Sequence, residues 1–217
     1  MIKHKVTYID ENPEDSRKFQ RHVKETLTVS SILPKPNIEE FVKELIHSSA
    51  DAFVIDFQLN EYRTAVIESV SYNGSNLVEK ILEIRKGFPC FVLTSYDTAA
   101  VEQIGDVNYV YHKNILNLEQ QMGITLAEKI RIQIEHYKKG VEEKANRFHE
   151  LLEKSESPGL SEVEENELLK LDSFLESTLN DYQAISIDKK NELAVGKINE
   201  LLDSTNTLLE RLRATRK

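Results

Sequence analysis

Acidic, hydroxyl and basic side chains directly follow short apolar segments of this 217-residue sequence. In chain order, these side chains are Asp10 and Glu11, Asp56, Thr94, and Lys113. Clustered carboxylates form a hard oxygen site of the kind that binds Mg²⁺. A carboxylate facing such a metal can attack a phosphoryl group and become an aspartyl phosphate. A hydroxyl and an ammonium group can then hold the phosphoryl oxygens. Phosphoryl transfer to an aspartate is therefore the chemistry that these residue types favour, if the fold brings them together.

The elements that must position these side chains alternate between strand and helix patterns. Strands are predicted from apolar runs over 6–9, 29–33, 52–55, 90–93 and 107–111. Helices are predicted from apolar spacing over 13–27, 37–46, 77–84 and 98–103. This alternation predicts an α/β fold, a doubly wound five-stranded parallel sheet with helices on both faces. The carboxyl ends of parallel strands share one edge of a sheet, so the polar groups are expected to form one site there.

Strand patterns stop after about residue 118, and apolar residues continue at helical spacing. A long stripe over 130–152 ends at the Ser-Pro-Gly break of 157–159, and the Ser-x-x-Glu of 161–164 opens another helix. We therefore predict one domain over 1–118, and an all-α helical hairpin or bundle over 119–217 that continues from the fifth helix of the first domain. The last stripe, over 194–212, alternates spacings of four and three. This pattern fits packing within one chain and in a homodimer equally well.

Net charge, the length of the apolar runs and the cysteine count indicate which kinds of partner and which compartment to expect. The net charge is −9, and residues 141–217 contribute −6 of it, which argues against a nucleic-acid-binding output because phosphate contacts need a basic surface. No apolar run approaches the ~20 residues needed to cross a bilayer, and the start has no signal-peptide pattern. A single cysteine, Cys90, allows no intramolecular disulfide and no thiolate metal cluster. We expect a cytoplasmic protein with neither nucleic acid nor membrane as partner.

In their order, these motifs resemble the response-regulator receiver (CheY-like) domain. Residues 9–15, Ile-Asp-Glu-Asn-Pro-Glu-Asp, look like the acidic turn of receivers, and Asp56 after Ala-Phe-Val-Ile matches the phosphoacceptor. Thr94 in Leu-Thr-Ser matches the switch hydroxyl, and Lys113 matches the lysine after the fifth strand. Gly74 and the residues after it resemble the glycine and third helix. The resemblance covers roughly residues 1–140.

The resemblance implies a role for each matched residue. Glu11 would bind Mg²⁺ directly, Asp10 through water, and Asp56 would be both a metal ligand and the nucleophile. The backbone carbonyl of Gln58 would complete the protein ligands. Thr94 and Lys113 would bind the phosphoryl group.

This sequence departs from the receiver pattern at the switch and after the phosphoacceptor. The switch aromatic of receivers lies three residues before the lysine, where this chain has Val110 flanked by Tyr109 and Tyr111. The candidate switch residues are therefore Thr94 and these two tyrosines. Residues 58–73 form a longer segment than receivers usually have, and we predict a mobile or specialised flap there. Glu11 stands where receivers usually have Asp.

The function that the resemblance implies is a two-component-type signalling switch rather than an enzyme. A histidine kinase or phosphotransfer protein would phosphorylate Asp56, and the change would reach a helical protein-interaction region that can also form a homodimer. The alternative is a pseudo-receiver that takes no phosphate and acts as an interaction scaffold.

Overall fold

The computed structural model describes residues 3–60, 70–95, 110–116, 125–156 and 159–178. The chain divides into two compact units, residues 1–140 and residues 141–217. The boundary between them falls within one unbroken helix, α5 (Leu126–Glu156). The first unit reaches Gly140, beyond the domain end expected at residue 118, because the first turns of α5 pack into its core.

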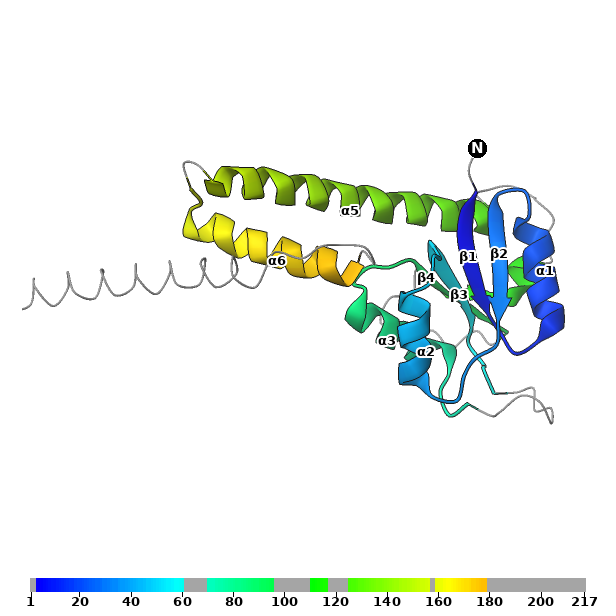
Figure 1. Ribbon diagram of the computed structural model, residues 1–217. Helices are drawn as coiled ribbons and strands as arrows, with labels where there is room; N and C mark the ends of the chain where they lie inside the picture. Colours follow the sequence, from blue (N-terminus) through cyan, green and yellow to red (C-terminus); the bar gives the residue numbers. More distant parts are fainter. Residues whose placement is uncertain (1–2, 61–69, 96–109, 117–124, 157–158, 179–217) are drawn as a thin grey trace, which may run out of the picture. The chain divides into compact units, whose positions relative to one another are not determined.

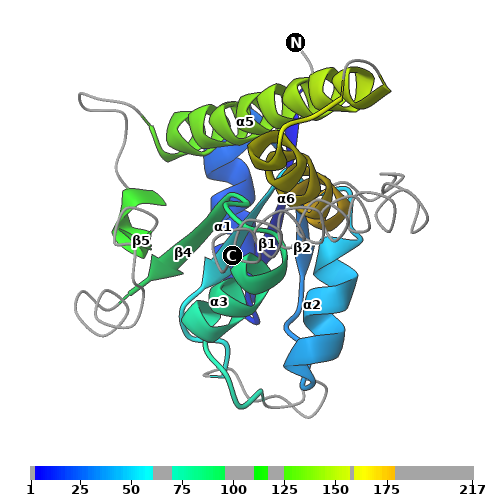
Figure 2. The ribbon, with the colours of Figure 1, turned by 90° about the vertical axis from the view of Figure 1, so that its left-hand side faces the viewer.

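Five parallel strands form one sheet in the order β2-β1-β3-β4-β5 (Figure 2). The strands are β1 (His4–Ile9), β2 (Leu27–Ile32), β3 (Ala52–Asp56), β4 (Cys90–Thr94) and β5 (Val110–His112). This strand order is that of the doubly wound flavodoxin-like fold, so the predicted fold class is confirmed. Ile9 of β1 lies beside Ile55 of β3, and Asp56 lies beside Leu93 of β4. The three central strands therefore end side by side at one edge.

Helices cover both faces of this sheet (Figures 1 and 2). The helices are α1 (Pro13–Val23), α2 (Ile38–Ile46), α3 (Gly74–Ile84) and the first turns of α5. Side chains on β1 and β3 alternate between the two layers. Tyr8 and Val54 pack with α1 and α5, whereas Ile9 and Ile55 pack with α2 and α3. Both layers are fully buried, which explains why the central strands are continuous apolar runs.

Asparagine side chains cap the N-termini of α1, α2 and α3. The Asn12 side chain accepts from the Glu14 amide and Pro13 takes the first helical position, so the chain turns sharply from β1 into α1. Asn73 forms a capping box with Asn76 at the start of α3. These caps place the first turns of α1 and α3 next to the carboxyl ends of the strands.

Several predicted boundaries differ from those of the structure, and part of the prediction lies outside the described residues. The helix predicted over 13–27 ends at Val23, because Leu27 already pairs in β2. The helix predicted from residue 77 begins at Gly74. The helix predicted over 98–103 and the first residues of the strand predicted over 107–111 lie outside the described residues.

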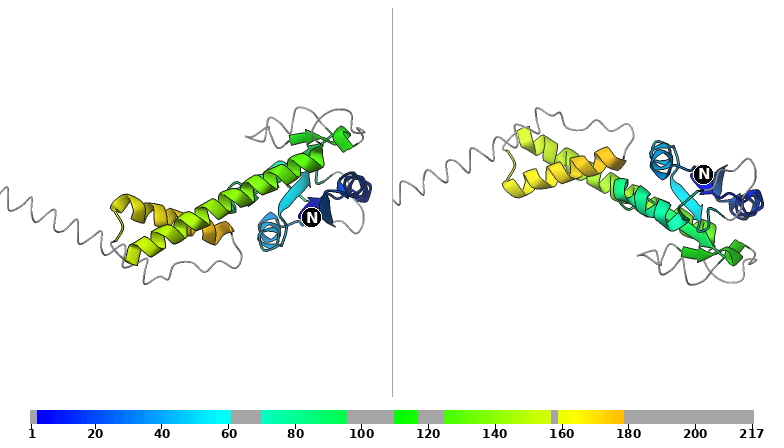
Figure 3. Two further views of the ribbon diagram at one scale, coloured as in Figure 1. Left: turned by 90° about the horizontal axis from the view of Figure 1, so that it is seen from above. Right: turned by 90° about the horizontal axis from the view of Figure 1, so that it is seen from below.

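The second unit, in its described residues, is a helical hairpin. The end of α5 and α6 (Glu162–Thr178) run antiparallel (Figure 3). They enclose Phe148, Leu151, Leu168 and Leu175. Arg147 pairs with Glu167 at 2.9 Å across the hairpin. The predicted cap at the start of α6 is confirmed, since the Ser161 amide donates to the Glu164 carboxylate at 3.0 Å. The stripe over 194–212 lies outside the described residues. Within the part of the chain that the structure describes, no helix is both long and apolar enough to cross a membrane.

Candidate functional site

The predicted acidic and basic side chains meet at the carboxyl ends of the strands. Asp10 follows β1, Asp56 is the last residue of β3, and Lys113 follows β5. The Lys113 ammonium nitrogen lies 3.0 Å from Oδ1 of Asp56 and 3.4 Å from Oδ2 of Asp10. The structure thus brings together three of the residues that the sequence singled out for phosphoryl chemistry.

A third carboxylate, that of Asp15, also contacts Lys113. The sequence places Asp15 in the acidic turn but predicts no role for it in the site. Its Oδ2 atom lies 2.8 Å from the Lys113 nitrogen, the shortest of the three ion-pair distances of this lysine. Asp15 lies in the first turn of α1. Acidic residues are common in the first turn of a helix because they complement the helix dipole. From the sequence, Asp15 therefore needs no further explanation, and its contact with Lys113, 98 positions away, is visible only in the structure.

Asp10 is fixed in place by two hydrogen bonds besides its contact with Lys113. The Tyr8 hydroxyl donates to Oδ2 of Asp10 at 2.7 Å, and the Asn12 amide donates to Oδ1 at 2.7 Å. Burial raises the pKa of the Asp10 carboxyl, and the positive charge of Lys113 offsets part of that rise. Burial and the adjacent Asp10 also raise the pKa of Tyr8, so its hydroxyl remains a donor.

The cluster carries more negative charge than Lys113 can balance. Burial, and to a smaller extent repulsion from Asp10, raises the pKa of Asp56 to about 7, although the positive charge of Lys113 acts in the opposite direction. Burial alone would raise the pKa of Asp15 as well, but hydrogen bonds and charge from Lys113 and Lys18 lower it below its usual value. Burial would lower the pKa of Lys113, but Asp56 and Asp10 raise it above its usual range, so the ammonium is charged. One half-buried ammonium among three carboxylates leaves a site that favours further positive charge.

The other predicted site residues neighbour this cluster along the chain or across the sheet. Glu11 and Thr94 are buried, with 2% and 3% of their surfaces exposed, and Gln58 is half-buried two residues after Asp56. Among the described residues, no three His, Cys, Asp or Glu side chains stand close enough together to hold a metal ion. In this arrangement Lys113 lies between Asp10 and Asp56. The chemistry of the donors still fits Mg²⁺, because they are carboxylate oxygens with excess negative charge.

Gly74 allows the start of α3 to lie directly against Asp56. Its amide donates to the Phe57 carbonyl at 2.8 Å. A Cβ atom at position 74 would lie 2.2 Å from the Asp56 carbonyl oxygen, a distance that real Cβ atoms do not show. Any side chain at this position would therefore displace the backbone of Asp56.

The predicted switch residues lie on different parts of the sheet. The Tyr111 ring packs 6.3 Å from the Phe91 ring, and Lys129 of α5 lies 5.1 Å above it, on the face covered by α1 and α5. Val110 packs against the opposite core, with α2 and α3. Thr94 ends β4 beside the cluster. Tyr109 lies outside the described residues.

The long segment after Asp56 is anchored at both ends. Leu59, Val70 and Tyr72 are buried in the core shared with α2 and α3, and the Tyr72 hydroxyl donates to the Lys35 carbonyl at 2.5 Å. The ends of the predicted flap are thus part of the core. Residues 61–69 lie outside the described residues, so the flap itself stays a prediction.

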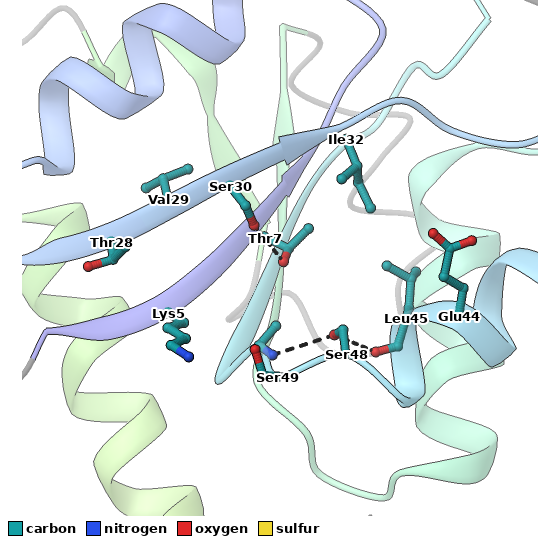
Figure 4. Close-up of a pocket in the computed structure, with 11 residues that line it drawn as sticks. Lys5, Thr7, Thr28, Val29, Ser30, Ile32, Glu44, Leu45, Ser48 and Ser49 are labelled. Atoms are coloured by element: carbon teal, nitrogen blue, oxygen red, sulfur yellow. Dashed lines mark hydrogen bonds between the residues drawn. The ribbon is translucent and has the colours of Figure 1, made fainter.

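A hollow of about 350 Å³ lies apart from the acidic cluster, between β1, β2 and the end of α2 (Figure 4). Its lining includes the hydrogen-bonded hydroxyls of Thr7 and Ser30, 3.1 Å apart. Ser48 bonds to the Leu45 carbonyl at the end of α2. None of the residues that line this hollow belongs to the cluster around Lys113.

No protein-family model and no curated protein matches the sequence. Similar solved structures exist at low identity. The anti-anti-sigma factor PhyR from Bartonella quintana is 14% identical over 67% of this chain, with a TM-score of 0.43, and this chain spans about half of that protein, 52%. A response regulator receiver domain protein (CheY-like) from Methanospirillum hungatei is 14% identical over 64% of this chain and 99% of its own length, with a TM-score of 0.44. RcsB from Salmonella enterica, bound to a promoter, is 14% identical over 89% of this chain and 100% of its own, with a TM-score of 0.41.

Proposed function

We propose that this receiver-like chain is a two-component-type signalling switch in which Asp56 accepts a phosphoryl group. The observation that supports this most directly is the position of the Asp56 carboxylate, at the end of a buried strand and 3.0 Å from the Lys113 ammonium. A carboxylate buried to this degree is costly, and chemistry at the site gives it a reason. The rigid sheet and the backbone contact with Gly74 hold Asp56 in place.

In the proposed reaction, a carboxylate oxygen of Asp56 forms a bond to phosphorus while the nitrogen–phosphorus bond of a phosphohistidine breaks and the imidazole leaves. The phosphohistidine would belong to a partner histidine kinase or phosphotransfer protein. Lys113 and Thr94 would hold the phosphoryl oxygens through charge-assisted and ordinary hydrogen bonds. Only ionised Asp56 attacks, so its raised pKa makes added positive charge at the site favourable for the reaction.

Mg²⁺ is the cation that the donor set fits best. Asp10, Glu11, Asp56 and the backbone carbonyl of Gln58 are the groups that would hold it. When bound, the ion would neutralise charge on the phosphoryl oxygens. Tyr8 and the Asn12 amide keep Asp10 oriented toward the site. Lys113 would shift its contacts from Asp10 toward the phosphoryl group.

The relay to the helical region would pass through the short helix that begins at Lys113. This 3-10 helix, η2 (Lys113–Leu116), places Ile115 and Leu116 in the same core as Leu126 and Ile130 of α5. Movement of Lys113 would therefore disturb the base of α5, and α5 continues without a break to Glu156. We expect hydrogen exchange in α5 to change on phosphorylation. An unchanged α5 would rule out this route.

The helical region would act by contact with a protein, either a second copy of the chain or another partner. Residues 141–217 carry a net charge of −6, which opposes binding to nucleic acid. The cytoplasm is the compartment that fits a kinase-linked switch.

The second candidate is a scaffold that takes no phosphate. One observation favours it: Lys113 already bridges the carboxylates, and Asp56 has a pKa near neutrality, so the nucleophile is partly protonated at neutral pH. Such a site could be a stable end state rather than a reactive one.

Acetyl phosphate with Mg²⁺, followed by intact mass spectrometry, distinguishes the two candidates. We expect wild type to gain the mass of one phosphoryl group and Asp56→Asn to gain none. Glu14→Gln is the matched control, because it removes an exposed carboxylate from the first turn of α1 near the site. It should be modified like wild type. An unmodified wild type would favour the scaffold.

A further inference from the structure

We infer that Asp15 is a positioning residue of this site, one that holds the Lys113 ammonium from the α1 side and limits its approach to Asp10 and Asp56. The inference rests on the proposed function but begins from a contact that exists without any phosphoryl donor. Lys113 lies 2.8 Å from Asp15, 3.0 Å from Asp56 and 3.4 Å from Asp10. Of the three carboxylates, that of Asp15 lies closest to the Lys113 ammonium.

The Asp15–Lys113 pair differs from an ordinary surface ion pair. The two side chains are 17% and 15% exposed, so both have lost most of their hydration. An ion pair of this kind is maintained only when its geometry is good, and breaking it by removing one partner is costly. The pair also joins two separate elements, the first turn of α1 and the residue that follows β5. Asp15 therefore determines where Lys113 lies, and α1 takes part in the site.

The position of Lys113 matters because it competes with any cation for the same oxygens. Without the Asp15 charge, the ammonium would be shared between only Asp10 and Asp56, and the cluster would lose one negative charge. Both effects weaken the binding of a divalent cation at Asp10, Glu11 and Asp56. We expect the half-saturating Mg²⁺ concentration for phosphorylation to rise roughly three- to tenfold in Asp15→Asn, from the Coulomb energy of one partly screened charge. The rate at saturating Mg²⁺ should change less.

Lys18 provides a matched control. Its ammonium lies 3.1 Å from Oδ1 of Asp15, on the solvent side, with 47% of its side chain exposed. Lys18→Gln thus removes the other ion pair of Asp15 and leaves the Lys113 contact intact. Asp15→Glu restores the charge with a longer side chain, and it should recover part of the wild-type behaviour. A melting curve for each full-length variant confirms that the chain is folded.

The experiment has one readout that needs neither metal nor phosphate. An amine-acylating reagent is applied to each folded variant, and labelling of Lys113 is measured by peptide mass spectrometry. Acylation requires the neutral amine, and the Asp15 hydrogen bond is one of the contacts that raise the pKa of Lys113. We therefore expect several-fold faster labelling in Asp15→Asn, an intermediate rate in Asp15→Glu, and the wild-type rate in Lys18→Gln. Equal labelling of Lys113 in wild type and Asp15→Asn would overturn the inference.

The second readout is phosphorylation against Mg²⁺ concentration in the same four proteins. If wild type takes no phosphate while labelling follows the expected order, the proposed function fails and the positioning role remains. If wild type is phosphorylated and Asp15→Asn has an unchanged Mg²⁺ dependence, the proposed function remains, and Asp15 does not influence the cation site.

Discussion

Replacing Asp56 with asparagine tests the charge balance of the site through stability alone. The pKa of Asp56 rises from a usual value of 3.8 to about 7 in the folded chain, because of burial and the neighbouring Asp10. The folded state therefore binds this proton more tightly than the unfolded chain. A raised folded-state pKa contributes stability that is fully present below pH 3.8 and is lost as the pH rises through about 7. Asparagine carries no charge at any pH and so avoids that loss.

The shift sets the size of the expected effect. One pKa unit corresponds to about 1.4 kcal/mol. Raising the pKa from 3.8 to about 7 can therefore lower the free energy of unfolding by at most about 4 kcal/mol between pH 4 and pH 8. Asp10 and Asp56 titrate together, and the measured step belongs to the pair. We therefore expect Asp56→Asn to exceed wild type in free energy of unfolding by roughly 2 kcal/mol at pH 8, with a much smaller difference at pH 4.

Urea denaturation at several pH values, followed by far-ultraviolet circular dichroism, measures this difference. Asp15→Asn is the opposing control, because Lys113 and Lys18 hold the pKa of Asp15 below its usual value. A lowered pKa contributes stability above the unfolded value that is lost as the pH falls, so Asp15→Asn should be less stable than wild type at pH 7. If Asp56→Asn gains no stability over wild type between pH 4 and pH 8, the charge balance described for this cluster is wrong.

Two further predictions concern packing. Gly74→Ala should destabilise the first unit and slow phosphorylation by acetyl phosphate, because its Cβ would collide with the Asp56 carbonyl. Gly140→Ala in α5, where nothing lies within 4 Å, should instead stabilise the chain by up to about 1 kcal/mol. Equal melting temperatures for the two variants would contradict this prediction. Leu168→Ala should cost about 2–5 kcal/mol in the hairpin of the second unit, where Leu168 is fully buried, and an unchanged urea midpoint for that unit would show that the α5–α6 core is misassigned.

The sheet could be predicted from the sequence because its central strands are buried on both faces. The runs before Asp56 and Thr94 are apolar without interruption, and only a doubly covered strand requires this. Boundaries were less certain where two elements adjoin. Leu27 fits the helical spacing of α1, but its backbone pairs with His4 of β1. Sheet pairing therefore overrides a helical pattern that continues past Val23.

The candidate site could be predicted only in part, because its contacts are long-range. Chemistry and strand-end position identified Asp10, Asp56 and Lys113. The contact between Asp15 and Lys113 has no local pattern, because it depends on the angle at which α1 leaves β1. The same holds for Leu59 and Tyr72, which the sequence assigns to the predicted flap and whose side chains are buried in the core. The metal expected at Asp10, Glu11 and Asp56 remains a prediction, since Lys113 contacts two of these carboxylates in the described structure.

The excess charge of the cluster supports the proposed signalling switch over the scaffold. A scaffold has no need for three carboxylates around one half-buried lysine, since the ionisation of Asp56 costs stability near neutral pH. Proteins retain such costly arrangements mainly at sites that bind or react, where an added cation or phosphoryl group changes the balance. The charge on Asp56 acts directly on Lys113, and Lys113 joins η2 to α1 through its contact with Asp15. A change of charge at Asp56 would therefore change the contacts of two elements of the first unit, as the proposed switch requires.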